Sequence, residues 1–367
     1  MGVPFAWWRG GSLGLFKTQL LTVFSYFLLT AGLPAALPQL RRLATVFCIA
    51  NTAGALGVLL GGREEQGRIA LSYGKFNNPN EIAGILLLTL PFWLVPLLNI
   101  SSSLYARLKV LFAVGAIGLC VAVIFRTGSR AGELGLLAVL LLSLQLMPLS
   151  GKILAIFVAG VFYVGALSLQ PPELRERMLT FSSVEAGEEN QLTESAAGST
   201  NARRQLLIES LRVMITHPVF GVGVGNFSPY EADFAKRSHR HATWMGTHNT
   251  YTEVASETGI PGLLIYLTSM FFCFRALAPL RKDKANPETR ALAVAIHLSL
   301  VGFCVSAFFA HIAYGSQYYI IAGLCVALTR CARNAMDAQQ PIAPAPQMNF
   351  LRAQGTPRFR APLGVPR

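Results

Sequence analysis

Long apolar segments are the feature of this sequence that most limits its fold. Several of them approach the roughly 20 residues that a helix needs to cross about 30 Å of hydrocarbon. Hydrophobic residues make up 53% of the 367-residue chain and charged residues only 13%, about half of the charged share of a soluble domain. The sequence therefore excludes a soluble globular domain and predicts an all-α, polytopic integral membrane protein.

Nine apolar segments are predicted to span the membrane as helices. They lie at residues 19–37, 43–60, 82–98, 108–125, 134–149, 154–169, 262–280, 291–309 and 318–328. Short loops rich in Lys and Arg mark the cytoplasmic side, and the clearest of them is 275–290. Counting helices from that loop places the long segment 170–260 outside, together with the basic stretch 1–17. Because the charge rule favours an inside position for residues 1–17, we expect either leading helices before this chain or a tenth helix within it.

Four regions follow from this count. Residues 1–169 form an N-terminal transmembrane block, 170–260 a large external loop domain, 261–330 a C-terminal transmembrane block and 331–367 a disordered cytoplasmic tail. The tail is rich in Pro, Ala, Gln and Arg, a composition that cannot bury enough apolar surface to fold.

The external segment is predicted to have structure of its own. Residues 182–200 are expected to be a mobile loop, and 202–216 an amphipathic helix with Leu206, Leu207, Leu211 and Met214 at helical spacing, which the His217-Pro218 pair ends. The spacing of Thr250 and Glu253 is that of a capping box, so we expect a short helix over 251–258 that stops at Gly259 and restarts at Pro261.

Three arginines are candidates for binding an anion on the external side. Arg130 follows a tight Thr-Gly-Ser turn between two predicted helices. It can be an interfacial side chain that snorkels to the head groups, but ionisable groups at that depth are also functional candidates. Arg203 and Arg204 begin the amphipathic helix and would alone be solvated charges. Beside Arg130, their planar donor forks could hold a diphosphate without a metal.

Two other motifs of the external segment are interpreted as structural. The run Gly221-x-Gly-x-Gly does not have the spacing of a nucleotide-binding motif and follows no predicted strand, so we expect it to reverse the chain. His239, His241 and His248, with Glu253 as a fourth ligand, could be assembled into a zinc site. A His-x-His pair in a loop is weak support for zinc, and we predict no metal.

Three segments in a fixed order carry a family resemblance. They are Thr127-Gly-Ser-Arg130, the stretch from the Arg203-Arg204 pair into Pro218-Val-Phe-Gly-Val-Gly-Val-Gly-Asn-Phe227, and His248-Asn249 with Gly259 and Gly262. Together with the upstream Phe76-Asn-Asn-Pro-Asn80, they resemble the superfamily of O-antigen ligases and O-antigen polymerases, the Wzy_C-type bacterial membrane glycosyltransferases. The resemblance covers roughly residues 73–276.

This resemblance implies a GT-C-like helical membrane fold with one large periplasmic loop domain. It implies as donor a glycan linked to undecaprenyl diphosphate, in the bacterial inner membrane, with neither a metal nor another cofactor. Carried over residue by residue, Arg130 and either Arg203 or Arg204 would bind the donor diphosphate, and His248 would be catalytic. Three neighbours of His248 would support it, namely Asn249, Glu253 and Glu257.

The acceptor is a separate question, because the same signature serves several enzymes. A ligase would use lipid A core, a polymerase a growing polysaccharide, and related enzymes a protein. The ligase is the first hypothesis and the repeat-unit polymerase the alternative. A transporter would distribute polar residues through its spans, and a scaffold would leave His248 dispensable.

The net charge of +13 is spread over both faces, which does not indicate nucleic-acid binding and fits partly with anionic lipid head groups.

Overall fold

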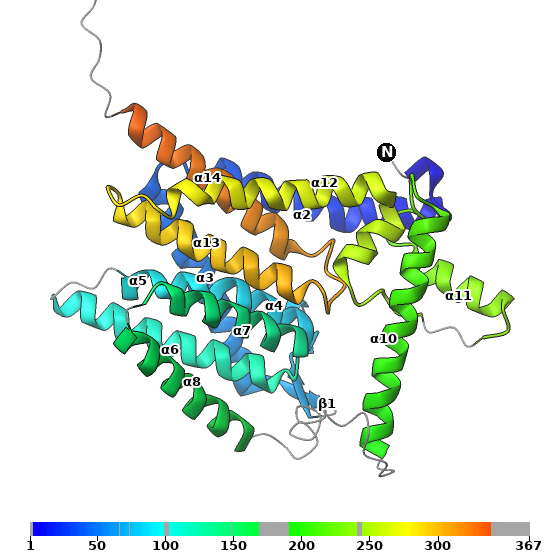
Figure 1. The fold of residues 1–367 in the computed structure, drawn as a ribbon, viewed down its shortest axis with the longest axis horizontal. Coiled ribbons are helices and arrows are strands. Elements are labelled where there is room, and N and C mark those ends of the chain that lie inside the picture. The colour runs from blue at the N-terminus through cyan, green and yellow to red at the C-terminus, as the bar shows by residue number, and fades with distance from the viewer. Residues whose placement is uncertain are drawn as a thin grey trace, which may run out of the picture.

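The fold is a bundle of helices with one small hairpin beside it (Figure 1). The computed structural model describes residues 3–65, 67–72, 74–98, 103–147, 149–168, 191–240 and 244–338. The α-helices are α1 (Arg9–Leu15), α2 (Leu21–Gly32), α3 (Leu37–Gly61), α4 (Pro79–Thr89), α5 (Val95–Leu98), α6 (Leu104–Arg126), α7 (Arg130–Gln145), α8 (Leu149–Ser168), α10 (Gln191–Thr216), α11 (Phe227–Arg237), α12 (Thr250–Leu280), α13 (Pro287–Ser306) and α14 (Ser316–Asp337). The π-helical turn η2 (Phe16–Leu20) joins α1 to α2, and the 3₁₀ segment η4 (Leu90–Leu94) joins α4 to α5. Strands β1 (Arg63–Glu65) and β2 (Arg68–Ala70) pair antiparallel.

Among the residues that the structure describes, five helical segments are long and apolar enough to cross a membrane. They are Arg9–Gly32, α3, α6, α12 and α13, and the shorter apolar stretches Pro79–Leu94 and Leu149–Gly165 lie beside them. A helix of 16 residues such as α7 rises only about 24 Å, which falls short of the hydrocarbon thickness. A mostly helical chain with apolar helices of membrane-spanning length agrees with the predicted fold class, whereas the nine predicted spans stay a prediction.

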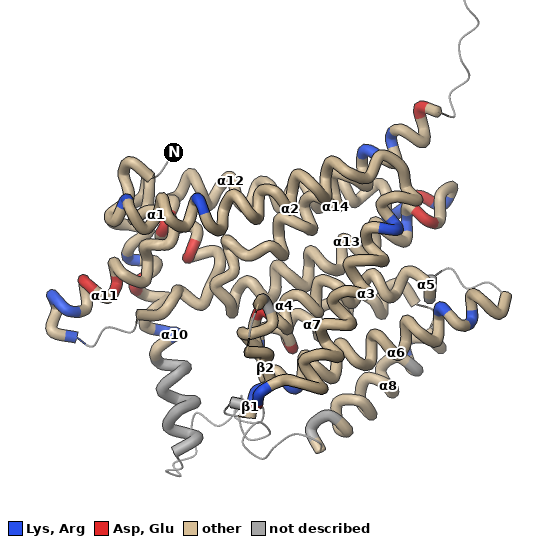
Figure 2. The backbone as a smooth tube through the Cα atoms, turned by 180° about the vertical axis from the view of Figure 1, so that it is seen from behind, with Lys and Arg blue, Asp and Glu red and all other residues tan. Residues whose placement is uncertain are grey.

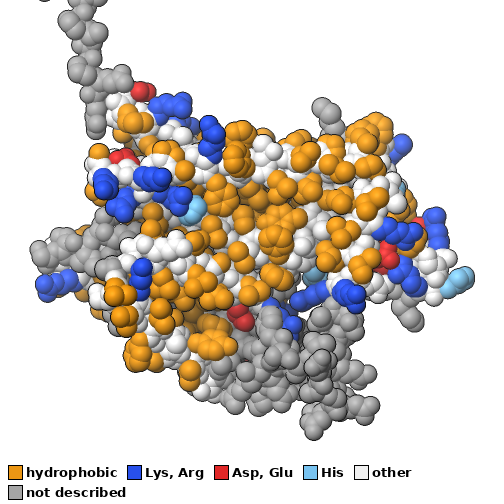
Figure 3. All heavy atoms as spheres, viewed as in Figure 1, with side chains coloured by type: hydrophobic (Ala, Val, Ile, Leu, Met, Phe, Trp, Pro, Cys, Tyr) orange, Lys and Arg blue, Asp and Glu red, His pale blue; other side chains and the backbone are white. Residues whose placement is uncertain are grey.

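Helix α13 is the central helix of the bundle. In its most apolar stretch 72% of the residues are buried inside the protein, against 6% for Arg9–Gly32. It packs against α7, α14 and α4. The surface of the bundle carries a broad hydrophobic band between charged ends (Figures 2 and 3), as expected for a protein surrounded by lipid tails.

One end of the bundle collects the residues that were predicted to be cytoplasmic. Arg41 at the start of α3 forms an ion pair of 2.9 Å with Glu288 at the start of α13. Arg330 of α14 donates hydrogen bonds to the carbonyls of Gly32 and Pro34, at 3.0 and 2.6 Å. The basic loop between α12 and α13 therefore lies beside the α2–α3 junction, as the helix count expects.

The N-terminal segment packs at the opposite end, against the segment that was predicted to be external. The backbone N–H of Trp7 donates to the carbonyl of Val222 at 2.9 Å, and the Ser12 hydroxyl donates to Val224 at 2.8 Å. The helix count had placed residues 1–17 and 170–260 on the same side, against the charge rule for the former. In the structure residues 7–12 and the glycine loop lie at the same end of the bundle, while the side of the membrane stays a prediction.

Three local expectations differ from the structure. Helix α10 begins at Gln191, so residues 191–200 are helical where a loop was expected; residues 182–190 lie outside the described residues. Its buried face is formed by Leu206, Ser210 and Val213, while Leu207 and Leu211 are exposed. Helix α14 continues to Asp337, past the expected start of the tail at 331, and residues 339–367 lie outside the described residues.

We predict that Ser238 and Lys284 lie on opposite sides of the membrane. Both are exposed, at the end of α11 and in the α12–α13 loop. The six native cysteines give little background, because five are buried and Cys304 is half-buried. In right-side-out spheroplasts, a membrane-impermeant maleimide should label Ser238→Cys and leave Lys284→Cys unlabelled until the membrane is opened. Equal labelling of both in intact spheroplasts would contradict the topology.

Candidate functional site

Helix α10 lies across one end of the bundle, and the loop that follows it turns back towards α12 (Figure 1). Gly221, Gly223 and Gly225 in this loop have φ values of 61°, 98° and 74°, which only glycine adopts readily. A Cβ atom on Gly221 would lie 2.3 Å from the carbonyl carbon of Glu257. The interpretation of this run as a chain reversal is confirmed.

The carboxylate of Glu257 joins three segments of the chain. It accepts hydrogen bonds from the backbone N–H groups of Gly225 at 2.6 Å and Phe227 at 3.0 Å, and from the Tyr314 hydroxyl at 2.7 Å. The side chain is buried. Glu257 therefore fixes the glycine loop and the turn before α14 onto the first turns of α12.

The predicted break in α12 is present at Gly259. This residue has φ 74° and ψ −177°, and a Cβ there would lie 2.6 Å from the Pro218 carbonyl oxygen. The predicted capping box is wrong. Asn249 caps the helix instead, because its side-chain oxygen accepts from the N–H groups of Tyr251 and Thr252. Glu253 points elsewhere and accepts from the N–H of Ala313 at 3.1 Å.

His248 stands directly before this cap in a strained backbone conformation. Its φ of 52° is in the left-handed region, which costs a non-glycine residue on the order of 1–3 kcal/mol and is typical of functional sites. Its Nε2 atom is buried and has no hydrogen-bond partner among the described residues. Burial, with smaller contributions from His311 and Arg203, lowers the pKa of His248 to about 4. The imidazole is therefore neutral at neutral pH.

The structure distinguishes between the two arginines of α10. Arg203 is half-buried, and its positive charge acts on His248, whereas Arg204 is exposed. The sequence left open which of these two arginines would face the donor, and the structure favours Arg203, whose charge acts on His248.

Arg130 is the first residue of α7 and is half-buried. Helix α7 packs against α13 so that a Cβ on Gly135 would lie 3.1 Å from the carbonyl oxygen of Gly302. Gly135 lies five residues after Arg130, the first residue of α7, and Gly302 lies four residues before Ser306, the last residue of α13. Arg130 therefore lies at the same end of the bundle as the turn after α13.

A second arginine meets the turn before Arg130. Arg68 of β2 donates through Nε to the Thr127 carbonyl at 2.7 Å and through a terminal nitrogen to Asn80 Oδ1 at 2.8 Å. Arg126 forms an ion pair of 3.5 Å with Glu64 of β1. Arg68 of the hairpin thus braces the turn that precedes Arg130, which the sequence did not predict because no local pattern joins these residues.

His311 is the other residue that sequence analysis missed. It lies in the turn 307–315 between α13 and α14, and its ring meets that of His248 edge to face, with centroids 5.0 Å apart. A lone histidine in an apolar stretch carries no motif, so only the fold reveals this contact.

The zinc alternative finds no support in the geometry. His239 is exposed at the end of α11, and Glu253 is buried against Ala313. His241 lies outside the described residues. Among the residues that the structure describes, no three His, Cys, Asp or Glu side chains are placed to share a metal ion.

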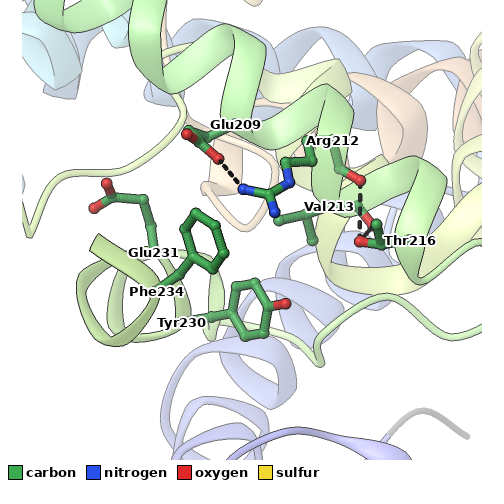
Figure 4. Close-up of a pocket in the computed structure, with 7 residues that line it drawn as sticks. All are labelled: Glu209, Arg212, Val213, Thr216, Tyr230, Glu231 and Phe234. Carbon is green, nitrogen blue, oxygen red and sulfur yellow. Dashed lines mark hydrogen bonds and ion pairs between the residues drawn. The ribbon is translucent and has the colours of Figure 1, made fainter. Parts of the chain in front are cut away.

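A small cavity of about 70 Å³ lies between α10 and α11 (Figure 4). Within it, Arg212 forms an ion pair of 3.5 Å with Glu209 and stacks on the Phe234 ring at 3.9 Å. The stacking contact joins α10 to α11, whereas the ion pair lies within α10. Neither His248 nor Arg203 lines this cavity, so we place the candidate site elsewhere.

These features define a helical membrane protein whose candidate site combines a half-buried histidine, with a buried Nε2, and arginines at one end of the bundle. Residues 115–267 match the family model of the O-antigen ligase (Wzy_C) domain. The resemblance inferred from the motifs is confirmed by this match, and the matched segment contains Arg130, Arg203 and His248. The family acts on lipid-linked polysaccharides, which supports a glycosyltransferase-like enzyme.

Curated proteins and solved structures add little to the family match. No curated protein matches the sequence significantly. Among solved structures, a chain from a study of the structural coordination of polymerization and crosslinking by a peptidoglycan synthase complex is similar, with 17% identity and a TM-score of 0.40. The similarity covers 85% of this chain and 88% of that chain. At this distance it carries no functional argument.

Proposed function

We propose that this protein is an inner-membrane glycosyltransferase that transfers a glycan from undecaprenyl diphosphate to an acceptor on the periplasmic face. The observation that carries this proposal is the half-buried His248 inside the matched segment 115–267, with a strained backbone, a buried and unpartnered Nε2 and the charge of Arg203 acting on it. Lipid A core is the proposed acceptor, as in a ligase. A growing polysaccharide, as in a repeat-unit polymerase, is the alternative that the first experiment below distinguishes.

The arginines suit the charge that develops during transfer. When the sugar–phosphate bond breaks, its electron pair goes to the diphosphate oxygen, and negative charge accumulates there. Fixed guanidinium groups in a partly dry site stabilise that charge without reorganising. Arg203 on α10 and Arg130 on α7 would bind the diphosphate, with the hairpin around Arg68 supporting the turn before Arg130.

His248 suits the role of general base. The acceptor hydroxyl oxygen attacks the anomeric carbon, and His248 takes the hydroxyl proton through its unpartnered Nε2. A pKa of about 4 keeps the imidazole neutral but makes it a weak base. A diphosphate bound beside Arg203 would favour the imidazolium and raise the pKa of His248 towards neutrality. The base would therefore become stronger when the donor is bound.

The proposed reaction needs no metal ion or other cofactor. Many glycosyltransferases hold a divalent cation between carboxylates and a diphosphate, but here guanidinium groups supply the positive charge. The two carboxylates nearest His248 in sequence already have structural partners: Glu253 binds Ala313, and Glu257 binds the glycine loop and Tyr314. The proposed partners are the lipid-linked glycan, its acceptor and the bilayer, with no role for nucleic acid.

We predict that a strain lacking this protein accumulates full-length glycan that is not attached to lipid A core. The polymer would remain on undecaprenyl diphosphate because its last transfer is blocked. Gel analysis of the lipopolysaccharide and of the extracted lipid-linked pool measures this. Lipid A core carrying single repeat units would identify a polymerase instead, and an unchanged profile of both pools would contradict glycan transfer altogether.

We predict that His248→Ala lowers transfer by about 10²- to 10⁴-fold, the usual contribution of a general base. The assay uses purified full-length protein and the lipid-linked glycan extracted from the deletion strain. His217→Ala is the matched control, because it also removes a histidine that packs edge to face on an aromatic ring. His217 directly follows α10, and the centroid of its ring lies 5.4 Å from that of Tyr230. Normal transfer by a monodisperse His248→Ala protein would refute the catalytic role.

We predict that Arg203→Lys and Arg130→Lys each lower transfer on the order of 10²-fold, because an ammonium keeps the charge but loses the planar fork that fits a phosphate. Arg204→Lys is the matched control and should stay close to wild type, since Arg204 is exposed. Equal loss in Arg203→Lys and Arg204→Lys would contradict the assignment of Arg203 as the donor-facing residue.

A further inference from the structure

The turn 307–315 is held against the start of α12 by a dense set of hydrogen bonds. The N–H of Thr250 donates to the Ala307 carbonyl at 2.8 Å, and its hydroxyl donates to Ala310 at 2.7 Å. Asn249 Nδ2 donates to the Phe308 carbonyl at 3.2 Å. With the bond from Ala313 to Glu253, these contacts fix the turn to the residues that directly follow His248.

The side chain of His311 uses this placement to contact His248. The two rings are nearly perpendicular, at 85°. On its other side the His311 ring lies over Gly246, where a Cβ atom would come within 2.8 Å of Cδ2. Glycine at 246 therefore leaves the space that His311 occupies beside His248.

We propose that His311 is a positioning residue for His248, holding its imidazole in the orientation that transfer requires. This inference rests on the proposed role of His248 as the base. The Asn249 cap fixes the chain directly after His248, but Nε2 of the His248 ring has no hydrogen bond to any described residue. The edge of a neighbouring aromatic ring is then the contact that restricts rotation of the side chain.

The electrostatic surroundings are consistent with a packing role. Facing His248 are His311 from the turn 307–315 and Arg203 from α10, and both disfavour the protonated form of His248. Glu253 on α12 is engaged with Ala313. His311 makes no hydrogen bond with His248 that would let it act as a direct proton partner, so its contribution is expected to come from the ring and not from its nitrogens.

The test compares three variants of the full-length protein in the transfer assay described above. His311→Ala removes the ring, and His311→Phe keeps an aromatic ring without nitrogens. Gly246→Ala crowds the His311 ring and leaves both histidine side chains chemically unchanged. His217→Ala again serves as the matched control for the loss of an edge-to-face contact outside the site. Each protein is first checked for abundance and monodispersity.

The expected result is a fall in kcat on the order of 10- to 100-fold for His311→Ala, since small misplacements of a reacting group have effects of this size. The KM for the lipid-linked donor should stay close to wild type. Gly246→Ala should show a smaller fall in kcat, and His311→Phe should recover most of it.

Two outcomes would overturn the inference. Wild-type kcat in both His311→Ala and Gly246→Ala would show that the contact does not matter. A loss in His311→Phe as large as in His311→Ala would show that the nitrogens are required, so that His311 does not act by packing. Failure of the proposed function is seen separately, because His248→Ala would then retain transfer whatever the His311 variants do.

Discussion

The buried carboxylate of Glu257 is the interaction on which the candidate site depends. Its two oxygens bind the glycine loop at Gly225 and Phe227 and the turn before α14 at Tyr314. A hydrogen bond to a charged group contributes about 1.5–3 kcal/mol, and a buried carboxylate without partners would cost more than that. Glu257 thereby holds the glycine loop and the turn before α14 to the first turns of α12, the helix that directly follows His248 and its cap.

Much of this region could be predicted because its signals are local. The kink at Gly259, the end of α10 before His217-Pro218 and the reversal at Gly221 each follow from the backbone preferences of glycine and proline. Local reasoning failed where several residues compete for one role. Asn249 caps α12 in place of Thr250 because its side chain reaches two free N–H groups while the Thr250 hydroxyl binds Ala310.

The site itself was only partly readable. Arg130, Arg203 and His248 stand in motifs, so the sequence could propose them, but it could not separate Arg203 from Arg204. That choice depends on which face of α10 packs inward, and the apolar residues Leu206, Leu207 and Leu211 leave two faces open. His311 and Arg68 have no motif around them. Their proximity to the site arises from tertiary packing, which one sequence alone does not encode in any periodic pattern.

The N-terminal segment has a consequence for how the site forms during biosynthesis. Trp7 and Ser12 bind the glycine loop of residues 221–225, and Gln19 donates to the carbonyl of Tyr314 at 2.9 Å. These partners leave the ribosome long after the N-terminal segment, and Tyr314 is among the last. Helix α1 and the turn η2 therefore gain these contacts only after the chain has been synthesised as far as Tyr314. A shorter nascent chain lacks these contacts around the candidate site, so the proposed transfer would have to wait for them.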